Sequence, residues 1–269
     1  MNGMNSELLQ RRRFLTCSLS TIFALRATQA FTADAPAEKR EFYELRTFYL
    51  SDETCRKRLS DYLEQALLPA LKRITGCPAG AFQSTDMQEN RCLTVVISFS
   101  SLQEFGEWNE RLNADITFQH AAKDYFAQTA EAPVWHRMES QLLQGLACLP
   151  KLVLPNGNTP HLFELRRYES PNLKLARLTV EMFNEGRLDE LMRQAGLAPV
   201  FFGETLIGNG PPNLTYLLSA ENEEEHEKHW RTFRSDPRWE RIRQMKKFQS
   251  TISEIRSRFL KPLAYSDIR

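Results

Sequence analysis

Patterns of apolar and polar residues follow one another in the same order twice along the chain. A two-residue period in β-branched and aromatic runs predicts strands, and an apolar stripe at three- to four-residue spacing predicts helices. The first half has predicted strands at 42–50, 79–83, 92–99 and 134–143, and helices at 52–74, 101–113 and 117–128. The second half has predicted strands at 162–168, 200–206, 213–220 and 251–260, and helices at 173–194, 223–233 and after Asp236-Pro237. Each half therefore has the order β-α-β-β-α-β.

The sequence itself repeats together with this pattern. Glu44-Leu45-Arg46 returns as Glu164-Leu165-Arg166, and Gly76 returns as Gly196, both 120 residues later. A repeat of this length is too long for a solenoid unit and indicates two copies of one small domain in tandem.

The element order predicts the fold class, which is α+β. The order β-α-β-β-α-β is that of the ferredoxin-like unit, an antiparallel sheet with helices on one face. The other face must also be covered, and the second copy is the obvious cover. We therefore predict two tandem ferredoxin-like repeats in a dimeric α+β barrel-like arrangement within one chain. The expected segments are a signal at 1–30, a lead-in at 31–39, repeat one at 40–149, a linker at 150–160 and repeat two at 161–269.

The N-terminus has the composition of a targeting segment. The stretch 11–15, Arg-Arg-Arg-Phe-Leu, resembles the twin-arginine export motif, and an apolar run too short to span a membrane follows it to Ala27. Small residues precede a plausible cleavage position after Ala30. Export to a bacterial periplasm is the expectation, with a mitochondrial transit peptide or an uninformative basic tail as alternatives.

Overall composition excludes some classes of function. The net charge of +1 argues against a nucleic-acid-binding surface, which needs an excess of clustered Lys and Arg. Beyond the signal segment the cysteines are Cys55, Cys77, Cys92 and Cys148, and none is repeated or set in a CxxC pair. Buried free thiols are therefore expected rather than a zinc site.

Several motifs after residue 40 resemble those of the NIPSNAP family, in the dimeric α+β barrel superfamily. Glu-Leu-Arg-x-Phe/Tyr opens each repeat, at 44–48 and 164–168. The segment Trp230–Trp239 resembles the family's aromatic-x-x-Phe-x-x-Asp-Pro-x-Trp helix, and 259–266 resembles its closing Leu-Lys-Pro-x-x-x-Ser. Repeat one lacks the Pro after Asp115, so repeat two holds the better copy. The family resemblance supplies no catalytic residues, and its relatives include haem-binding or haem-degrading proteins and cofactor-free monooxygenases, by analogy only.

Strand alternation predicts which side chains face the space between the two sheets. In β-strands successive side chains point to opposite faces. We expect Tyr43, Leu45, Phe163 and Leu165 to pack under the helices, and the alternate residues to face the other sheet. The predicted lining of this candidate pocket is Glu44, Arg46, Phe48, Arg137, Glu139, Glu164, Arg166, Tyr168, Glu254 and Arg256.

The first strand of a ferredoxin-like unit neighbours the last, so pairs across these strands are expected. Glu44 with Arg137, and Glu164 with Arg256, are the plausible ion pairs. They can form a structural salt network between the sheets or part of a ligand site, and the sequence leaves both interpretations open.

Metal and cofactor signals are weak. His226 and His229 lie one helical turn apart in a run of glutamates, with no third ligand in a recognised spacing, so no metal site is predicted. No cofactor is assigned, and haem is the alternative, with His136 as its conceivable axial ligand.

Two hypotheses for function result. The first is an exported NIPSNAP-type protein of uncharacterised activity that binds an unknown small molecule or protein, acting alone or as a homo-oligomer. The alternative is a small-molecule enzyme of the α+β barrel kind, either a cofactor-free monooxygenase or a haem-binding or haem-degrading protein. Whether the protein is an enzyme stays undecided: a pocket for a ring-sized ligand between the sheets would favour the enzyme, and a filled interior the binding protein.

Overall fold

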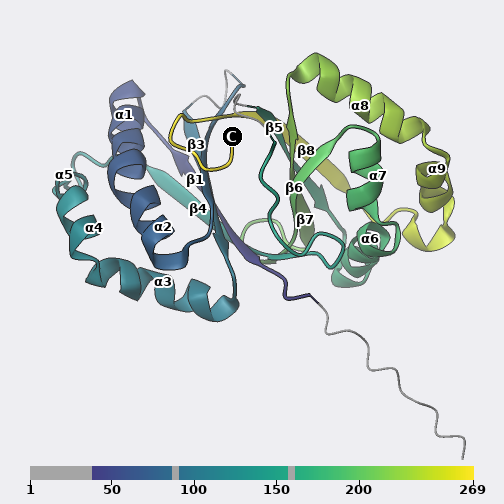
Figure 1. The fold of residues 1–269 in the computed structure, drawn as a ribbon, viewed down its shortest axis with the longest axis horizontal. Helices are drawn as coiled ribbons and strands as arrows, with labels where there is room; N and C mark the ends of the chain where they lie inside the picture. The colour runs from purple at the N-terminus through teal and green to yellow at the C-terminus, as the bar shows by residue number, and fades with distance from the viewer. Residues whose placement is uncertain (1–37, 87–90, 157–160) are drawn as a thin grey trace, which may run out of the picture. The chain divides into compact units, whose positions relative to one another are not determined.

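A computed structural model describes residues 38–86, 91–156 and 161–269 (Figure 1). The predicted signal segment with its arginine motif, the lead-in up to residue 37 and the last part of the linker lie outside the described residues. Among the helices of the described part, none has the length and apolar character needed to cross a membrane.

The strands form one closed antiparallel barrel. Repeat one contributes β1 (Phe42–Tyr49), β2 (Ala79–Ser84), β3 (Cys92–Phe99) and β4 (Arg137–Gly145). Repeat two contributes β5 (Leu162–Glu169), β6 (Ala198–Ile207), β7 (Asn213–Ala220) and β8 (Glu254–Pro262). The order around the barrel is β1-β3-β2-β8-β5-β7-β6-β4. Each half has its own last strand beside its first, as in the ferredoxin-like unit, which confirms the predicted fold class.

Two contacts between the repeats close the barrel. Strand β2 pairs with β8, and β4 pairs with β6, both antiparallel. The two sheets are therefore joined edge to edge within one chain, and no strand of the closed order is left as an edge.

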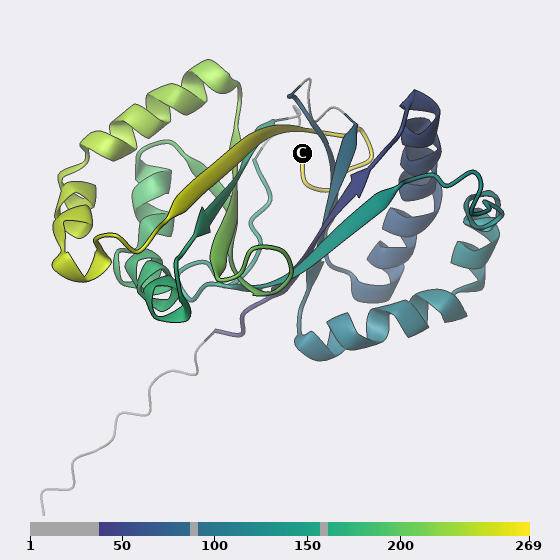
Figure 2. The same ribbon diagram turned by 180° about the vertical axis from the view of Figure 1, so that it is seen from behind.

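Helices cover the outside of the barrel in two groups, one on each repeat (Figures 1 and 2). Repeat one carries α1 (Glu53–Tyr62), a π-helical turn (Leu63–Leu67), α2 (Leu68–Thr75), α3 (Leu102–Ala114), α4 (Ile116–Ala121) and α5 (Lys123–Phe126). Repeat two carries α6 (Leu173–Glu185), α7 (Leu188–Gln194), α8 (Glu223–Ser235), α9 (Pro237–Gln244) and a 3₁₀ turn (Lys246–Phe248). The predicted helix 173–194 is divided at Gly186 and Arg187, where Arg187 has a φ of 48°.

Local sequence signals explain where these elements begin and end. Side-chain oxygens cap the first turns of α1, α3, α6 and α8 by accepting from backbone N–H groups; the capping residues are Asp52, Ser101, Asn172 and Asn222. The repeated Gly76 and Gly196 have φ values of 68° and 93°, and each lies between a helix and the next strand. The duplicated sequence therefore marks duplicated turns.

The apolar core has three parts. One cluster lies between β1–β3 and the helices of repeat one, and a second lies between the sheet and helices of repeat two. The third fills part of the barrel and draws on both repeats, including Tyr43, Phe82, Phe163 and Phe201. The C-terminal segment joins this inner core: Ile268 is fully buried in it, and the backbone N–H of Asp267 donates to the carbonyl of Ala79 at 3.0 Å.

Candidate functional site

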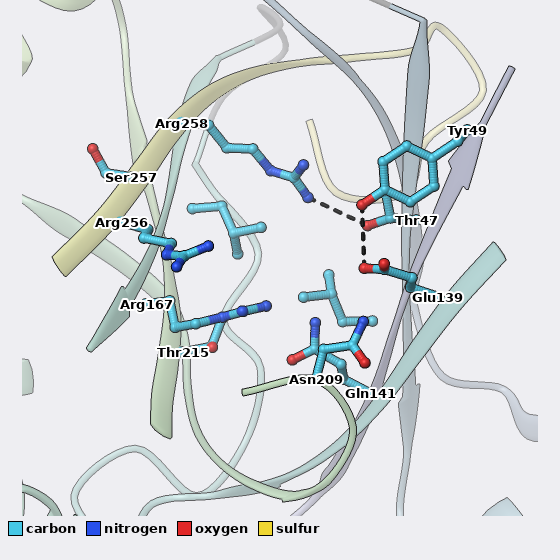
Figure 3. A pocket seen from close by; sticks show the side chains of 12 residues that line it. Thr47, Tyr49, Glu139, Gln141, Arg167, Asn209, Thr215, Arg256, Ser257 and Arg258 are labelled. Carbon is cyan, nitrogen blue, oxygen red and sulfur yellow. Dashed lines mark hydrogen bonds between the residues drawn. The ribbon is translucent and has the colours of Figure 1, made fainter. Parts of the chain in front are cut away.

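The barrel interior contains a cavity of about 360 Å³ beside the inner core (Figure 3). It lies where β1 and β5 end and β4 and β8 begin. Leu45 and Leu165, both members of the inner core, separate the cavity from the packed part of the barrel. Its lining comprises Leu45, Thr47, Tyr49, Glu139, Gln141, Leu165, Arg167, Asn209, Thr215, Arg256, Ser257 and Arg258.

Arginine side chains from repeat two form one wall, which we call the arginine wall: Arg167 on β5 with Arg256 and Arg258 on β8 (Figure 3). Arg258 reaches across the barrel, and its Nη2 donates to Thr47 Oγ1 at 3.3 Å and to Thr94 Oγ1 at 3.1 Å. Burial and the neighbouring charges of Arg258 and Arg256 lower the pKa of Arg167, while Glu169 opposes that effect. The wall thus gathers three cationic side chains at the cavity. Glu169 lies 3.7 Å from Arg167 and 3.5 Å from Arg256.

The facing wall comes from β1 and β4 of repeat one. Tyr49 donates its hydroxyl hydrogen to Glu139 Oε2 at 3.1 Å, and Arg137 Nη2 lies 2.5 Å from Glu139 Oε1. Burial and the neighbouring Glu139 carboxylate raise the pKa of Tyr49, so this side chain is a neutral hydroxyl at physiological pH. Gln141, which is 4% exposed, continues the same wall toward the inner core.

The loop between β6 and β7 borders the cavity through Asn209. Gly208, with a φ of 146°, packs directly on Gln141, because a Cβ at Gly208 would lie 2.5 Å from Gln141 Cγ. Glycine is therefore required both by the backbone conformation and by the close approach.

The structure places the predicted pocket residues in three different positions. Glu139 and Arg256 line the cavity. Arg137 and Glu254 are exposed beside them and form ion pairs with them. The remaining predicted residues point outward beneath the helices rather than into the barrel: Glu44, Arg46, Phe48, Glu164, Arg166 and Tyr168.

The prediction of which face of β1 and β5 points inward is therefore wrong, whereas the predicted alternation is present. Tyr43, Leu45, Phe163 and Leu165 belong to the inner core. The strand register gives the reason: Glu44 lies opposite Leu142, and Glu164 lies opposite Phe259. The expected pairs Glu44 with Arg137 and Glu164 with Arg256 would join side chains on opposite faces, and they do not form.

Three cavity residues were not predicted because the inward face of β1 and β5 was assigned to the wrong set of residues. Thr47, Tyr49 and Arg167 share the inward face of Leu45 and Leu165. The sequence does contain one sign of the cavity: on that face, apolar residues give way to polar ones toward the end of β1 and β5. Asn209 comes from a loop, where alternation carries no information.

The outward residues of β5 form a buried polar cluster beneath α8, which we call the Glu164 cluster. Glu164 Oε2 lies 2.7 Å from His226 Nε2 and accepts from Trp230 Nε1 at 3.0 Å, while its Oε1 accepts from Arg166 Nη1 at 2.9 Å. The Arg166 guanidinium also lies 4.7 Å from the centre of the Trp230 ring. The cluster fixes helix α8 to strand β5 through a carboxylate.

Repeat one contains a simpler counterpart. Glu44 Oε1 accepts from Arg46 Nε and from Ser140 Oγ, both at 2.6 Å, and Arg46 lies 4.6 Å from the centre of the Trp108 ring. The repeated Glu-Leu-Arg motif thus has one structural meaning in both halves. Its leucine packs inside the barrel, its glutamate pairs with its arginine, and that arginine stacks on a helix tryptophan.

Stability should depend on pH through Glu164. Burial raises the pKa of this carboxyl group, but the hydrogen bond to His226, the charge of Arg166 and the Trp230 N–H outweigh it, so the pKa lies below its usual 4.5. A lowered pKa contributes stability above the unfolded-state value, and that stability is lost as pH falls through the folded-state value. We expect urea unfolding between pH 6 and 3, roughly the carboxyl range, to show a shallower acid loss for Glu164→Gln than for the wild type.

The exposed control for that comparison is Glu240→Gln on α9, whose ion pair with Arg243 lies on the surface. It should retain the wild-type pH dependence, since exposed pairs contribute little. Equal acid sensitivity of the wild type and Glu164→Gln would contradict the assignment.

The residues offered for metal or haem binding do not lie in the cavity. No group of three or more His, Cys, Asp or Glu within 38–86, 91–156 and 161–269 is arranged to hold a metal ion. His226 is buried against Glu164, whereas His229 is partly exposed near Glu225. His136 is exposed and precedes β4, contrary to its expected place on the apolar side of that strand, so it does not fit as an axial haem ligand in the cavity.

Solved structures with a similar fold span most of the chain. A candidate monooxygenase from Lactobacillus acidophilus has a TM-score of 0.54 at 7% identity, covering 83% of this chain and 94% of its own. A second, from Fusobacterium nucleatum subsp. nucleatum, has a TM-score of 0.55 at 10% identity, covering 84% and 94%. At these identities the likeness establishes the α+β barrel fold alone.

Matches to the NIPSNAP family cover less of the chain. A NIPSNAP family protein of unknown function from Agrobacterium tumefaciens covers 42% of this chain and 98% of its own, at 15% identity and a TM-score of 0.37. No curated protein matches the sequence. The NIPSNAP family model matches residues 163–267, which hold the Glu164 cluster and the arginine wall. The similarity to the NIPSNAP family therefore lies in the second repeat of this chain.

Proposed function

We propose that this protein binds a small organic anion, specifically a carboxylate, in the barrel cavity. The observation that carries the proposal is the arginine wall, Arg167, Arg256 and Arg258, within an interior whose other half is packed with apolar side chains. Guanidinium groups bind carboxylates through charge-assisted, often bidentate, hydrogen bonds.

Size and shape support a small ligand. A volume of about 360 Å³ lies near the lower end of the range of roughly 300–1,000 Å³ for ligand pockets. Leu45 and Leu165 supply an apolar surface for the body of the ligand, and the polar walls fix its orientation. The same cavity would also serve a small-molecule enzyme such as the monooxygenases named for the two similar barrels. Both functions require that the cavity bind a ligand, and binding is therefore tested first.

Titration calorimetry with phenylacetate and its neutral isostere phenylacetamide tests the proposal. We expect phenylacetate to bind more tightly to the wild type, and Arg258→Gln to weaken its binding about ten- to hundredfold, because a hydrogen bond to a charged group contributes about 1.5–3 kcal/mol. Arg243→Gln, which removes an exposed arginine on α9, should leave binding unchanged.

Two results would overturn the proposal. The first is equal binding of the acid and the amide by the wild type. The second is binding of phenylacetate by Arg258→Gln and Arg256→Gln at the wild-type affinity, since the arginine wall would then have no part in recognition.

A further inference from the structure

The two halves of the cavity are related by the repeat, yet they carry different chemistry. Leu45 faces Gln141 across β1 and β4, and its counterpart Leu165 faces Arg258 across β5 and β8. Gln141 and Arg258 therefore occupy equivalent positions in the two repeats. By the same register Glu139 corresponds to Arg256, and Thr47 corresponds to Arg167.

This comparison shows a polarised cavity. Repeat two supplies cationic donors at the positions where repeat one supplies neutral or acidic groups. A ligand that carried only carboxylates would suit the arginine wall and leave the opposite wall without a partner. The asymmetry instead fits a molecule with two different ends.

Gln141 indicates which chemical group the second end of the ligand must carry. Its side chain lines the cavity, is 4% exposed, and its Oε1 atom accepts no hydrogen bond from the described residues. The acceptors beside it are already engaged: Glu139 interacts with Arg137 and Tyr49, and Thr47 accepts from Arg258. This acceptor is shielded from solvent and requires a donor. The terminal torsion of a glutamine amide is soft, and a half-turn of the carboxamide would bring the oxygen to a ligand in the cavity.

The two ends must lie close together. Arg258 already spans the barrel to Thr47, and Thr47 is a diagonal neighbour of Gln141 on the inward face of β1 and β4. Diagonal neighbours across antiparallel strands are about 7–8 Å apart. A hydroxyl donor suits the site better than an ammonium group, because Arg137 already balances the charge of Glu139 and the arginine wall repels cations.

We propose that the ligand is a short hydroxy acid whose carboxylate binds the arginine wall and whose hydroxyl donates to Gln141. This inference rests on the proposed carboxylate binding and adds the residue that selects the second group. Gln141 is thus a specificity-determining residue.

The test compares mandelate with phenylacetate, which differ by one hydroxyl group, in calorimetric titrations. The wild type should bind mandelate about tenfold more tightly, because a buried acceptor left unpaired penalises the analogue that lacks the hydroxyl. In Gln141→Leu the two acids should bind with equal affinity. Gln144→Leu, on the outward face of the same strand, should retain the wild-type preference.

Stability provides a second measurement. Since Gln141 Oε1 has no partner among the described residues, Gln141→Leu and Gln141→Met should unfold at the same denaturant concentration as the wild type or a higher one. Gln141→Met replaces Gln141→Leu in the titrations if the leucine variant fails to fold.

The outcomes separate the two proposals. Equal binding of mandelate and phenylacetate by the wild type, with both tighter than phenylacetamide, overturns the hydroxy-acid inference and leaves carboxylate binding intact. A retained preference for mandelate in both Gln141 variants also overturns it. Binding of neither acid overturns both proposals.

Discussion

Replacing Glu164 with alanine should lower the free energy of unfolding by about 3–5 kcal/mol, the cost of removing one partner from a buried ion pair. Glu164 is 4% exposed and accepts from Arg166 and Trp230, while His226 lies within hydrogen-bond distance. Alanine would leave a largely buried guanidinium without its carboxylate and a buried imidazole without its acceptor. The indole N–H would keep only His226 Nε2, which lies 3.0 Å from it. Denaturant titration followed by circular dichroism measures the loss.

Repeat one supplies the matched control. Glu44 interacts with Arg46 and Ser140 through one oxygen. His226 lies four residues before Trp230, and the residue four before Trp108 is Glu104, whose carboxylate accepts from the backbone N–H of Ser100 instead. Glu44→Ala should therefore cost less than Glu164→Ala. A loss below about 1 kcal/mol for Glu164→Ala, as for a surface pair, would show that the cluster does not hold α8 to the sheet.

The architecture was predictable because the turn residues, the helix caps, the apolar periodicity and the repeat all indicate the same element order. The repeated Gly76 and Gly196 end corresponding segments, and Asp52, Ser101 and Asn222 cap helices where the apolar stripes begin. Local propensity, capping and duplication all pointed to the same element order. That order leaves few topologies, and a closed barrel of two sheets satisfies it.

The orientation of β1 and β5 was not predictable from the same information. Both faces of β5 mix apolar and charged residues: Phe163, Leu165 and Arg167 point inward, and Leu162, Glu164 and Arg166 point outward. Alternation divides these residues into two sets but does not say which set is inside. The deciding facts are long-range, such as the pairing of Glu164 with Phe259 and the tryptophan on α8 that receives Arg166.

Charged residues do not avoid the helix-covered face in this protein, since Glu44 and Glu164 are buried there. A helix can bury a carboxylate when it brings a histidine, an indole N–H or an arginine with it. The Glu and Arg of the repeated Glu-Leu-Arg motif therefore attach a helix to the sheet. The polar lining of the cavity comes from residues outside the motif, such as Thr47, Gln141 and Arg258.

Replacing Phe163 with alanine should test whether the two repeats unfold as one unit. Phe163 of repeat two is fully buried in the inner core, with its ring centre 5.1 Å from that of Phe82 of repeat one in an edge-to-face contact. Truncation of a buried phenylalanine costs about 3–5 kcal/mol. We expect a loss of this size, whereas Leu173→Ala, which removes a side chain 69% exposed, should change stability by less than about 0.5 kcal/mol.

The inner core draws on both repeats, so the Phe163→Ala loss should appear in both at once. Trp108 and Trp135 report on repeat one, and Trp230 and Trp239 report on repeat two. Two backgrounds, Trp108→Phe/Trp135→Phe and Trp230→Phe/Trp239→Phe, let fluorescence follow repeat two and repeat one respectively. Both backgrounds should show the same shift in unfolding midpoint, and a double-mutant cycle with Phe82→Ala should give a coupling of about 0.5–1.5 kcal/mol, as for aromatic pairs. If the midpoint shifted only in the background that retains Trp230, the repeats would be independent domains, and a cavity built from both walls could not stay preorganised for a ligand.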